Sequence, residues 1–147
     1  MRRTAKQLEQ ARDSVLESVL AFVDQRGALA VLKAPPGSGK THVCLRAVVL
    51  GWHRGQRMAV VTQTNAQADD FCRRMSAEFP AVPVCRFASG SYDPGDLGAS
   101  VQVSCKARDL PAGRAVVVGT GAKWAFSGDL EPFDAMVIDE AWQMTWA

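Results

Sequence analysis

Apolar residues recur at helical spacing in three segments and form short, nearly unbroken runs in several others. The spacing from Thr4 to about Gln25 predicts an amphipathic helix, and residues 41–53 have the same helical character. A third helix is predicted from Asn65, a residue suited to capping a first turn, to the residue before Pro80. Short apolar runs predict strands at residues 28–33, 58–62, 82–87, 115–118 and 135–138, with a weaker signal at 101–104.

The alternation of predicted strands and helices indicates an α/β fold with a parallel sheet. Strands that are nearly continuous in apolar residues are typical of parallel sheets covered on both faces. The length of 147 residues fits one compact domain. We expect an N-terminal helix within residues 1–27 that leads into a lobe formed by residues 28–147. The stretch 88–113 is rich in Gly, Ser, Asp and Pro, and little is predicted there beyond the weak strand.

Composition narrows the possible functions only slightly. A net charge of +2 is too small to argue for nucleic-acid binding by bulk electrostatics. No apolar run approaches the length needed to span a bilayer, and the polar start does not resemble a signal peptide, so we expect a cytoplasmic protein. The cysteines contain no Cys-x-x-Cys pair and suggest neither a zinc site nor a disulfide framework. They are Cys44, Cys72, Cys85 and Cys105.

A glycine-rich loop, Ala34-Pro-Pro-Gly-Ser-Gly-Lys-Thr41, lies between a predicted strand and a predicted helix. Closely spaced glycines let backbone N–H groups turn inward around phosphate oxygens, and the following helix points its positive end at the same place. Lys40 is expected to reach the β- and γ-phosphates of ATP, and the Thr41 hydroxyl to bind Mg²⁺. Ala34 stands where the GxxxxGK[ST] pattern has its first glycine. The predicted nucleotide-binding residues are Pro36, Gly37, Ser38, Gly39, Lys40 and Thr41. The alternative is a flexible turn that happens to precede Lys-Thr.

Two adjacent carboxylates, Asp139 and Glu140, follow the last predicted strand. Ligands of open α/β sheets bind at the edge where strands end. We therefore predict a Walker B site, in which Asp139 binds Mg²⁺ and Glu140 orients and deprotonates the attacking water. The predicted catalytic residues are thus Lys40 and Glu140, and the predicted metal ligands are Thr41 and Asp139. Taken alone, such a pair is more often a solvated surface turn.

Three segments together resemble superfamily 1 helicases of the DEAxQ type. They are the loop Pro35-Pro-Gly-Ser-Gly-Lys-Thr41, the run Val60-Val-Thr-Gln-Thr-Asn-Ala-Gln-Ala-Asp69 and the ending Asp139-Glu-Ala-Trp-Gln143. The resemblance implies a P-loop NTPase with a RecA-like parallel sheet and flanking helices, here expected to stop after the Walker B strand. It implies ATP and Mg²⁺ as cofactors and nucleic acid, most simply single-stranded DNA, as the partner.

The resemblance also implies roles for individual residues. The middle segment is motif Ia, which contacts the nucleic-acid backbone, so Thr64 and Asn65 are expected contacts; Ala68 stands where Val is usual. A segment like Val116-Val-Val-Gly-Thr120 commonly precedes the DEAxQ strand, which makes Thr120 a further possible contact. Gln143 is expected to couple the nucleotide site to the bound nucleic acid. In many family members an upstream glutamine reads adenine, and Gln7 or Gln10 can serve.

Two parts of the family pattern are missing from this sequence. One is a second RecA-like lobe that carries arginines to the γ-phosphate, which is therefore an expected partner. The other is a Gly-Asp-x-x-Gln strand that lies between the loop strand and the acidic strand in the family fold. We expect a gap in the sheet at that place and an isolated chain that is marginally stable or prone to aggregation.

Two other functions stay open at this point. The chain can be a different P-loop ATPase, such as a helicase loader or a phage packaging motor, that shares only the loop and the acidic pair. It can also be a non-catalytic nucleotide-binding fragment. Trp124, Trp142 and Trp146 can stack on bases, although large aromatic residues near apolar strands are more often part of the core.

Overall fold

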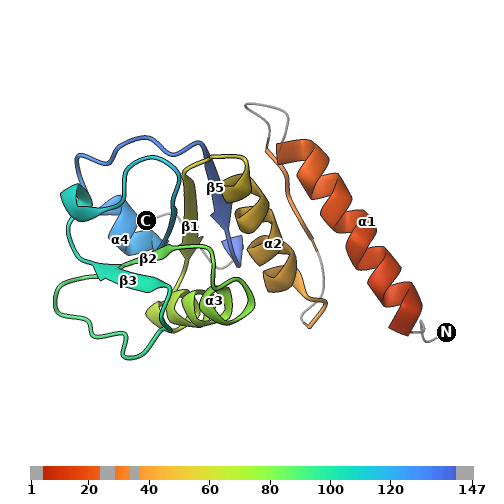
Figure 1. The fold of residues 1–147 in the computed structure, drawn as a ribbon, viewed down its shortest axis with the longest axis horizontal. Helices are drawn as coiled ribbons and strands as arrows, with labels where there is room; N and C mark the ends of the chain where they lie inside the picture. Colours follow the sequence, from red (N-terminus) through yellow and green to blue (C-terminus); the bar gives the residue numbers. More distant parts are fainter. Residues whose placement is uncertain (1–4, 24–28, 34–36, 142–147) are drawn as a thin grey trace.

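A computed structural model describes residues 5–23, 29–33 and 37–141 of the chain (Figure 1). The four α-helices are α1 (Ala5–Val23), α2 (Lys40–His53), α3 (Asn65–Glu78) and the short α4 (Gly121–Ala125), and a 3-10 turn, η1, covers Ala107–Asp109. The strands are β1 (Met58–Thr62), β2 (Val84–Phe87), β3 (Val101–Ser104), β4 (Val116–Thr120) and β5 (Ala135–Ile138). Within the described ranges, no helix is both long enough and apolar enough to cross a membrane.

The five strands form one sheet in the order β3-β2-β4-β1-β5, and every neighbouring pair is parallel. The predicted α/β fold with a parallel sheet is therefore confirmed, and the architecture is compatible with a RecA-like lobe. β1, β2 and β4 are buried at every position because both of their faces are covered. Parallel pairing brings the carboxyl ends of all five strands to one edge of the sheet.

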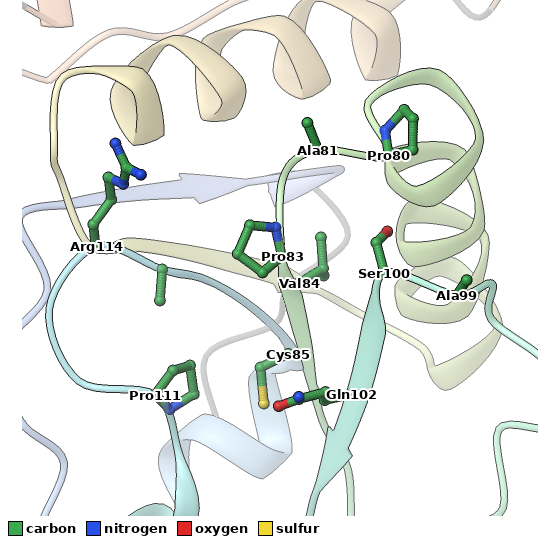
Figure 2. A pocket seen from close by; sticks show the side chains of 11 residues that line it. Pro80, Ala81, Pro83, Val84, Cys85, Ala99, Ser100, Gln102, Pro111 and Arg114 are labelled. Atoms are coloured by element: carbon green, nitrogen blue, oxygen red, sulfur yellow. The ribbon is translucent and has the colours of Figure 1, made fainter.

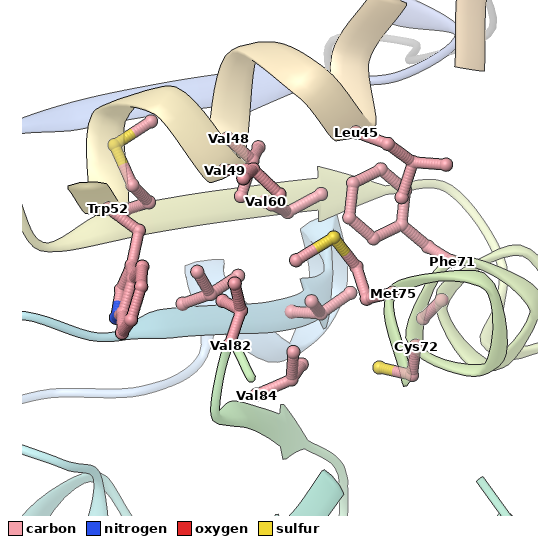
Figure 3. Packing of buried hydrophobic residues seen from close by; sticks show 14 of the residues in the cluster. Leu45, Val48, Val49, Trp52, Val60, Phe71, Cys72, Met75, Val82 and Val84 are labelled. Atoms are coloured by element: carbon pink, nitrogen blue, oxygen red, sulfur yellow. The ribbon is translucent and has the colours of Figure 1, made fainter. Parts of the chain in front are cut away.

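Helices α2 and α3 cover one face of the sheet and form the larger core with it (Figure 3). Their inward side chains recur at helical spacing, and they pack on the alternate positions of the strands that face them. From α2 these are Leu45, Val48, Val49 and Trp52, from α3 Ala68, Phe71, Cys72 and Met75, and from the strands Met58, Val60, Val84, Val116 and Val118. The helical character predicted for both segments is confirmed.

A smaller core covers the other face, and among the described residues no long helix contributes to it. Cys85, Phe87 and Val117 point to this side and pack against Leu110, while the Trp124 ring lies edge-on to Phe87 with 5.3 Å between centroids. Trp124 also donates a 3.2 Å hydrogen bond from Nε1 to the carbonyl oxygen of Val60. A Cβ atom on Gly119 would lie 2.9 Å from that indole nitrogen, so the glycine is what allows the ring to approach the sheet.

One predicted strand is wrong. The described part of the segment 28–33, residues 29–33, contains no strand, and Leu29 and Val31 are 84% and 70% exposed. An apolar run becomes a strand only when a neighbour takes up its backbone hydrogen bonds, and the sheet offers it none. The sheet ends instead at β5, where Met136 and Ile138 are 57% and 45% exposed. The gap expected between a loop strand and the acidic strand is not seen among the described residues, because no loop strand forms there and β5 is the edge of a continuous sheet. An exposed apolar edge of this kind favours aggregation.

Candidate functional site

The glycine loop enters α2 through two residues with left-handed backbone geometry. Gly37 has φ of 74° and Gly39 has φ of 88°, a region that side chains other than glycine rarely adopt. Gly39 is the N-cap of α2, and no side chain caps the helix there. The first N–H groups of α2 are thus left without a capping side chain, which is the arrangement that binds anions at helix N-termini. Pro36 lies outside the described residues.

Ser38 gives an independent sign of a ligand in the loop. Its Oγ atom is buried and has no hydrogen-bond partner within the described parts of the chain. A buried hydroxyl left unsatisfied costs about 1–3 kcal/mol, so such groups are rare unless something else binds them. The loop therefore fits an oxygen-rich anion such as a phosphate.

The loop and the acidic pair meet although 98 residues separate them. Thr41, in the first turn of α2, donates from Oγ1 to Oδ2 of Asp139 over 3.4 Å. Asp139 directly follows β5 and is held there by its own N–H, which donates to the Val61 carbonyl on β1 at 3.0 Å. Parallel pairing of β5 with β1 thus places the carboxylate opposite the helix that begins at Lys40.

Burial is the main cause that raises the pKa of the Asp139 carboxyl above its usual range, and the negative charge of Glu140 adds to it. The Thr41 hydroxyl and the Lys40 ammonium oppose this rise because they favour the charged form. The same burial raises the pKa of the nearby Cys44 thiol to about 12, with a further contribution from Asp139. Cys44 is therefore a neutral packing residue near the site.

Glu140 has a backbone conformation that is uncommon for its residue type. Its φ is 55°, in the left-handed region that non-glycine residues seldom occupy. Strain of this kind often lies at functional sites, where the surrounding structure holds it in place.

The candidate metal ligands are one hydroxyl oxygen and one carboxylate oxygen, from Thr41 and Asp139. No group of three or more His, Cys, Asp or Glu side chains able to hold a metal ion occurs in the described ranges. Mg²⁺ is usually bound by one or two protein oxygens, with phosphate and water oxygens completing its shell. The neighbouring oxygens of Thr41 and Asp139 meet that requirement.

The predicted nucleic-acid contacts lie at the same edge of the sheet. Thr64 follows β1 and caps α3: its hydroxyl accepts from the N–H of Gln67, whose own side chain accepts from the N–H of Thr64. Thr120 ends β4, beside β1, and is only 9% exposed. Its hydroxyl accepts from the N–H of Lys123 as the cap of α4, so the structure gives Thr120 a local role.

Sequence reasoning missed a buried polar cluster behind Asn65. Arg86, on β2, is fully buried, and its Nε donates to Oδ1 of Asp69 at 2.7 Å. Its Nη2 donates to Oδ1 of Asn65 at 2.8 Å, while the hydroxyl of Tyr92 donates to Oδ2 of Asp69. An arginine inside the apolar run 84–87 was the available signal, because such a charge is rarely buried without a partner.

Several predicted residues have other surroundings or lie outside the description. Trp124 is partly buried and packs against the smaller core, which agrees with the core role that the sequence favoured for it over base stacking. Gln143, Trp142 and Trp146 lie outside the described residues. Gln7 and Gln10 are both exposed on α1, and adenine reading by either stays a prediction.

A cavity of about 450 Å³ lies at the opposite edge of the sheet (Figure 2). It opens at the amino ends of β2, β3 and β4, where Val84, Ser100 and Ala115 contribute to its wall. Prolines form much of the remaining wall. None of the predicted site residues lines it, so the cavity is separate from the candidate site.

Comparison of the chain with protein-family models, with curated proteins and with solved structures found no match.

Proposed function

We propose that this chain binds ATP with Mg²⁺ at the glycine loop and acts as the first motor lobe of a nucleic-acid helicase or translocase. The observation that carries the proposal is the approach of Thr41 to Asp139 across 98 residues of sequence. A flexible turn and a solvated acidic pair would have no reason to meet at the start of a helix. The hydroxyl of Ser38, which has no partner among the described residues, is a second and independent observation that supports the same site.

Each residue has a separate task in this proposal. Lys40 and the uncapped N–H groups of α2 neutralise the charge of the phosphates. Thr41 and Asp139 would hold Mg²⁺, which would stabilise the negative charge of the phosphates. Glu140 orients the attacking water and accepts its proton.

The nucleic-acid part of the proposal depends on the carboxyl edge of β1. Thr64 and Asn65 begin α3 directly after this strand, and β1 lies next to the strand that carries Asp139. A nucleic-acid strand bound at the start of α3 would thus be separated from the nucleotide by the width of one β-strand. This short path favours a motor lobe over an ATPase in which only the loop and the acidic pair are shared.

The test is ATP binding and hydrolysis by the purified chain, with and without Mg²⁺ and with and without a single-stranded oligodeoxythymidine. Lys40→Ala is expected to lower hydrolysis about 10²- to 10³-fold, the usual loss when one preorganised charge donor is removed. Lys6→Ala, at an exposed position on α1, is the matched control and is expected to keep full activity.

The outcomes separate the possible functions. Binding of Mg²⁺-ATP that needs Lys40, together with binding of the oligonucleotide, supports the motor lobe. Nucleotide binding and hydrolysis without any response to DNA or RNA would leave a general P-loop ATPase. Binding without turnover in any condition favours a nucleotide-binding protein. Equal ATP affinity in Lys40→Ala and the unchanged chain contradicts the proposal.

A further inference from the structure

Arg86 joins three separate parts of the fold from a fully buried position on β2. It reaches α3 through Asp69 and Asn65, and its Nη1 donates to the carbonyl oxygen of Phe87 at the end of its own strand. Its guanidinium also lies 5.7 Å from the ring centroid of Tyr92, in the segment after β2. A buried arginine is tolerated only when its donors are bonded, and this one has bonds in three directions.

The contact with Asn65 fixes the orientation of that side chain. An arginine can only donate hydrogen bonds, so the amide atom of Asn65 that faces Nη2 at 2.8 Å must be its oxygen. The amide nitrogen lies on the other side of the same planar group and faces away from Arg86. Asn65 is half-buried in the first turn of α3, at the carboxyl edge of the sheet. Its N–H donors are therefore presented on the side away from the buried arginine.

We propose that Arg86 is a positioning residue for nucleic-acid binding, which turns the amide of Asn65 so that its N–H donors meet a phosphate oxygen of the bound strand. This inference rests on the proposed function. A phosphate oxygen accepts hydrogen bonds and cannot donate them, so an Asn65 amide turned the other way would oppose it with its own carbonyl oxygen. Arg86 thereby determines whether the oxygen or the nitrogen of the Asn65 amide faces the bound nucleic acid.

Two neighbouring interactions support this orientation of the Asn65 side chain. Asp69 is 4% exposed and neutralises the arginine through the 2.7 Å contact with Nε, which prevents an unpaired buried charge. The capping box of Thr64 and Gln67 fixes the backbone of the first turn of α3 independently of Arg86. Loss of the arginine should therefore release the Asn65 side chain while the helix start stays in place.

The test is a double-mutant cycle read by the dissociation constant for a fluorescently labelled oligodeoxythymidine. Arg86→Lys keeps a positive charge beside Asp69 but lacks the fork that reaches Asn65 as well. We expect it to weaken binding about five- to tenfold, which lies within the usual range for the loss of one hydrogen bond. In an Asn65→Ala background, the same substitution should change the affinity by less than about twofold, because the group it orients is gone.

Three further variants guard against an effect on folding alone. Tyr92→Phe removes one bond to Asp69 from the same cluster without touching Asn65, and it should leave strand affinity unchanged. Asn65→Asp keeps an oxygen toward Arg86 but replaces the donors by an acceptor, and it should lose as much affinity as Asn65→Ala. Lys40→Ala should lose ATP binding and keep strand binding, which shows that the two readouts are independent.

Equal weakening by Arg86→Lys in both backgrounds would overturn the inference, since Arg86 would then act on the fold as a whole. If Asn65→Asp binds the strand as tightly as the unchanged chain, the donors of Asn65 are not used and the inference fails as well. A chain that binds Mg²⁺-ATP but neither DNA nor RNA contradicts the nucleic-acid part of the proposed function, and the role of Arg86 falls with it. If the chain binds the oligonucleotide and the effects of Arg86→Lys and Asn65→Ala on affinity are additive, only the role of Arg86 is rejected.

Discussion

Two groups of polar side chains lie at the carboxyl edge of the sheet, and they differ in whether their hydrogen-bonding atoms have partners within the protein. In the cluster of Asn65, Asp69, Arg86 and Tyr92, polar atoms are paired with one another. At the glycine loop, the hydroxyl of Ser38 has no partner within the described residues, and α2 starts without a capping side chain.

The difference indicates what each region is for. A satisfied buried network holds a conformation in place and needs nothing from outside. Buried polar groups without a hydrogen-bond partner lower the stability of the free protein unless a ligand binds them. The burial of a carboxylate such as Asp139 has the same effect. The paired cluster therefore acts as a scaffold, whereas we propose that the glycine-loop region is a binding site.

Asp69→Ala is expected to have the largest effect. It leaves the guanidinium of Arg86 buried without its counter-charge, which should lower the free energy of unfolding by about 3–5 kcal/mol. Urea unfolding followed by circular dichroism measures this change. Asp70→Ala is the control, because Asp70 is half-exposed in its pair with Arg74 and should cost less than about 0.5 kcal/mol. Similar losses from both variants would show that the cluster is not a scaffold.

Saturating Mg²⁺-ATP should give the next largest effect, in the stabilising direction. A ligand at about 100 times its Kd adds about 2.7 kcal/mol to the free energy of unfolding. For a chain of this size the melting temperature should rise by about 5–10 °C. Differential scanning fluorimetry measures the shift, and Lys40→Ala should abolish it while Lys6→Ala keeps it. An unchanged melting temperature at saturating nucleotide would mean that the open polar groups do not form a nucleotide site.

Asp139→Asn should stabilise the ligand-free chain slightly. Burial and Glu140 raise the pKa of the Asp139 carboxyl in the folded state, so the ionised form is disfavoured there. The folded state then holds its proton more tightly than the unfolded state, and stability is lost as pH rises through the folded pKa. Near neutral pH the melting temperature should increase by only about 1–2 °C, since solvent screens this half-exposed carboxylate. At a pH below both pKa values the gain should disappear.

The control for this variant is Asp129→Asn, at an exposed position with φ of 56° that asparagine also adopts. It should leave the melting temperature unchanged. Asp139→Asn should also lose the stabilisation by Mg²⁺-ATP. A lower melting temperature for ligand-free Asp139→Asn would place Asp139 in the scaffold.

The smallest effect is the titration of Tyr92, which is the only tyrosine in the chain. Its hydrogen bond to Asp69 is the main cause that raises its pKa above the usual 10.0, because the bond needs the phenol proton. The stability from this bond is present below pH 10 and is lost as pH rises through the folded pKa. The ultraviolet absorbance of tyrosinate reports this single group. Asp69→Asn should lower the pKa toward its usual value, and an unchanged pKa would show that the bond is not formed.

Much of the fold could be predicted because its signals are local. The strands at 58–62 and 135–138 agree with the structure residue for residue, whereas the residue that caps the third helix is Thr64 and not the predicted Asn65. Their runs are apolar because both faces of a parallel strand are buried, and the capping box of α3 is contained in four consecutive residues. The segment 29–33 was predicted wrongly because a local signal is not enough to form a strand. Its apolar character is local, but a strand also needs a neighbour, and none lies beside it.

The sequence by itself determined the parallel α/β class, the glycine geometry of the loop and the residue types at the candidate site. Only the tertiary structure decided that Thr41 lies beside Asp139, that Arg86 holds Asn65, and that the sheet ends at β5. Spacing and propensity are properties of neighbouring residues, whereas these contacts join residues that the order of the strands brings together. Strand order is set by the packing of the whole sheet against its helices, so no single segment of the chain contains it.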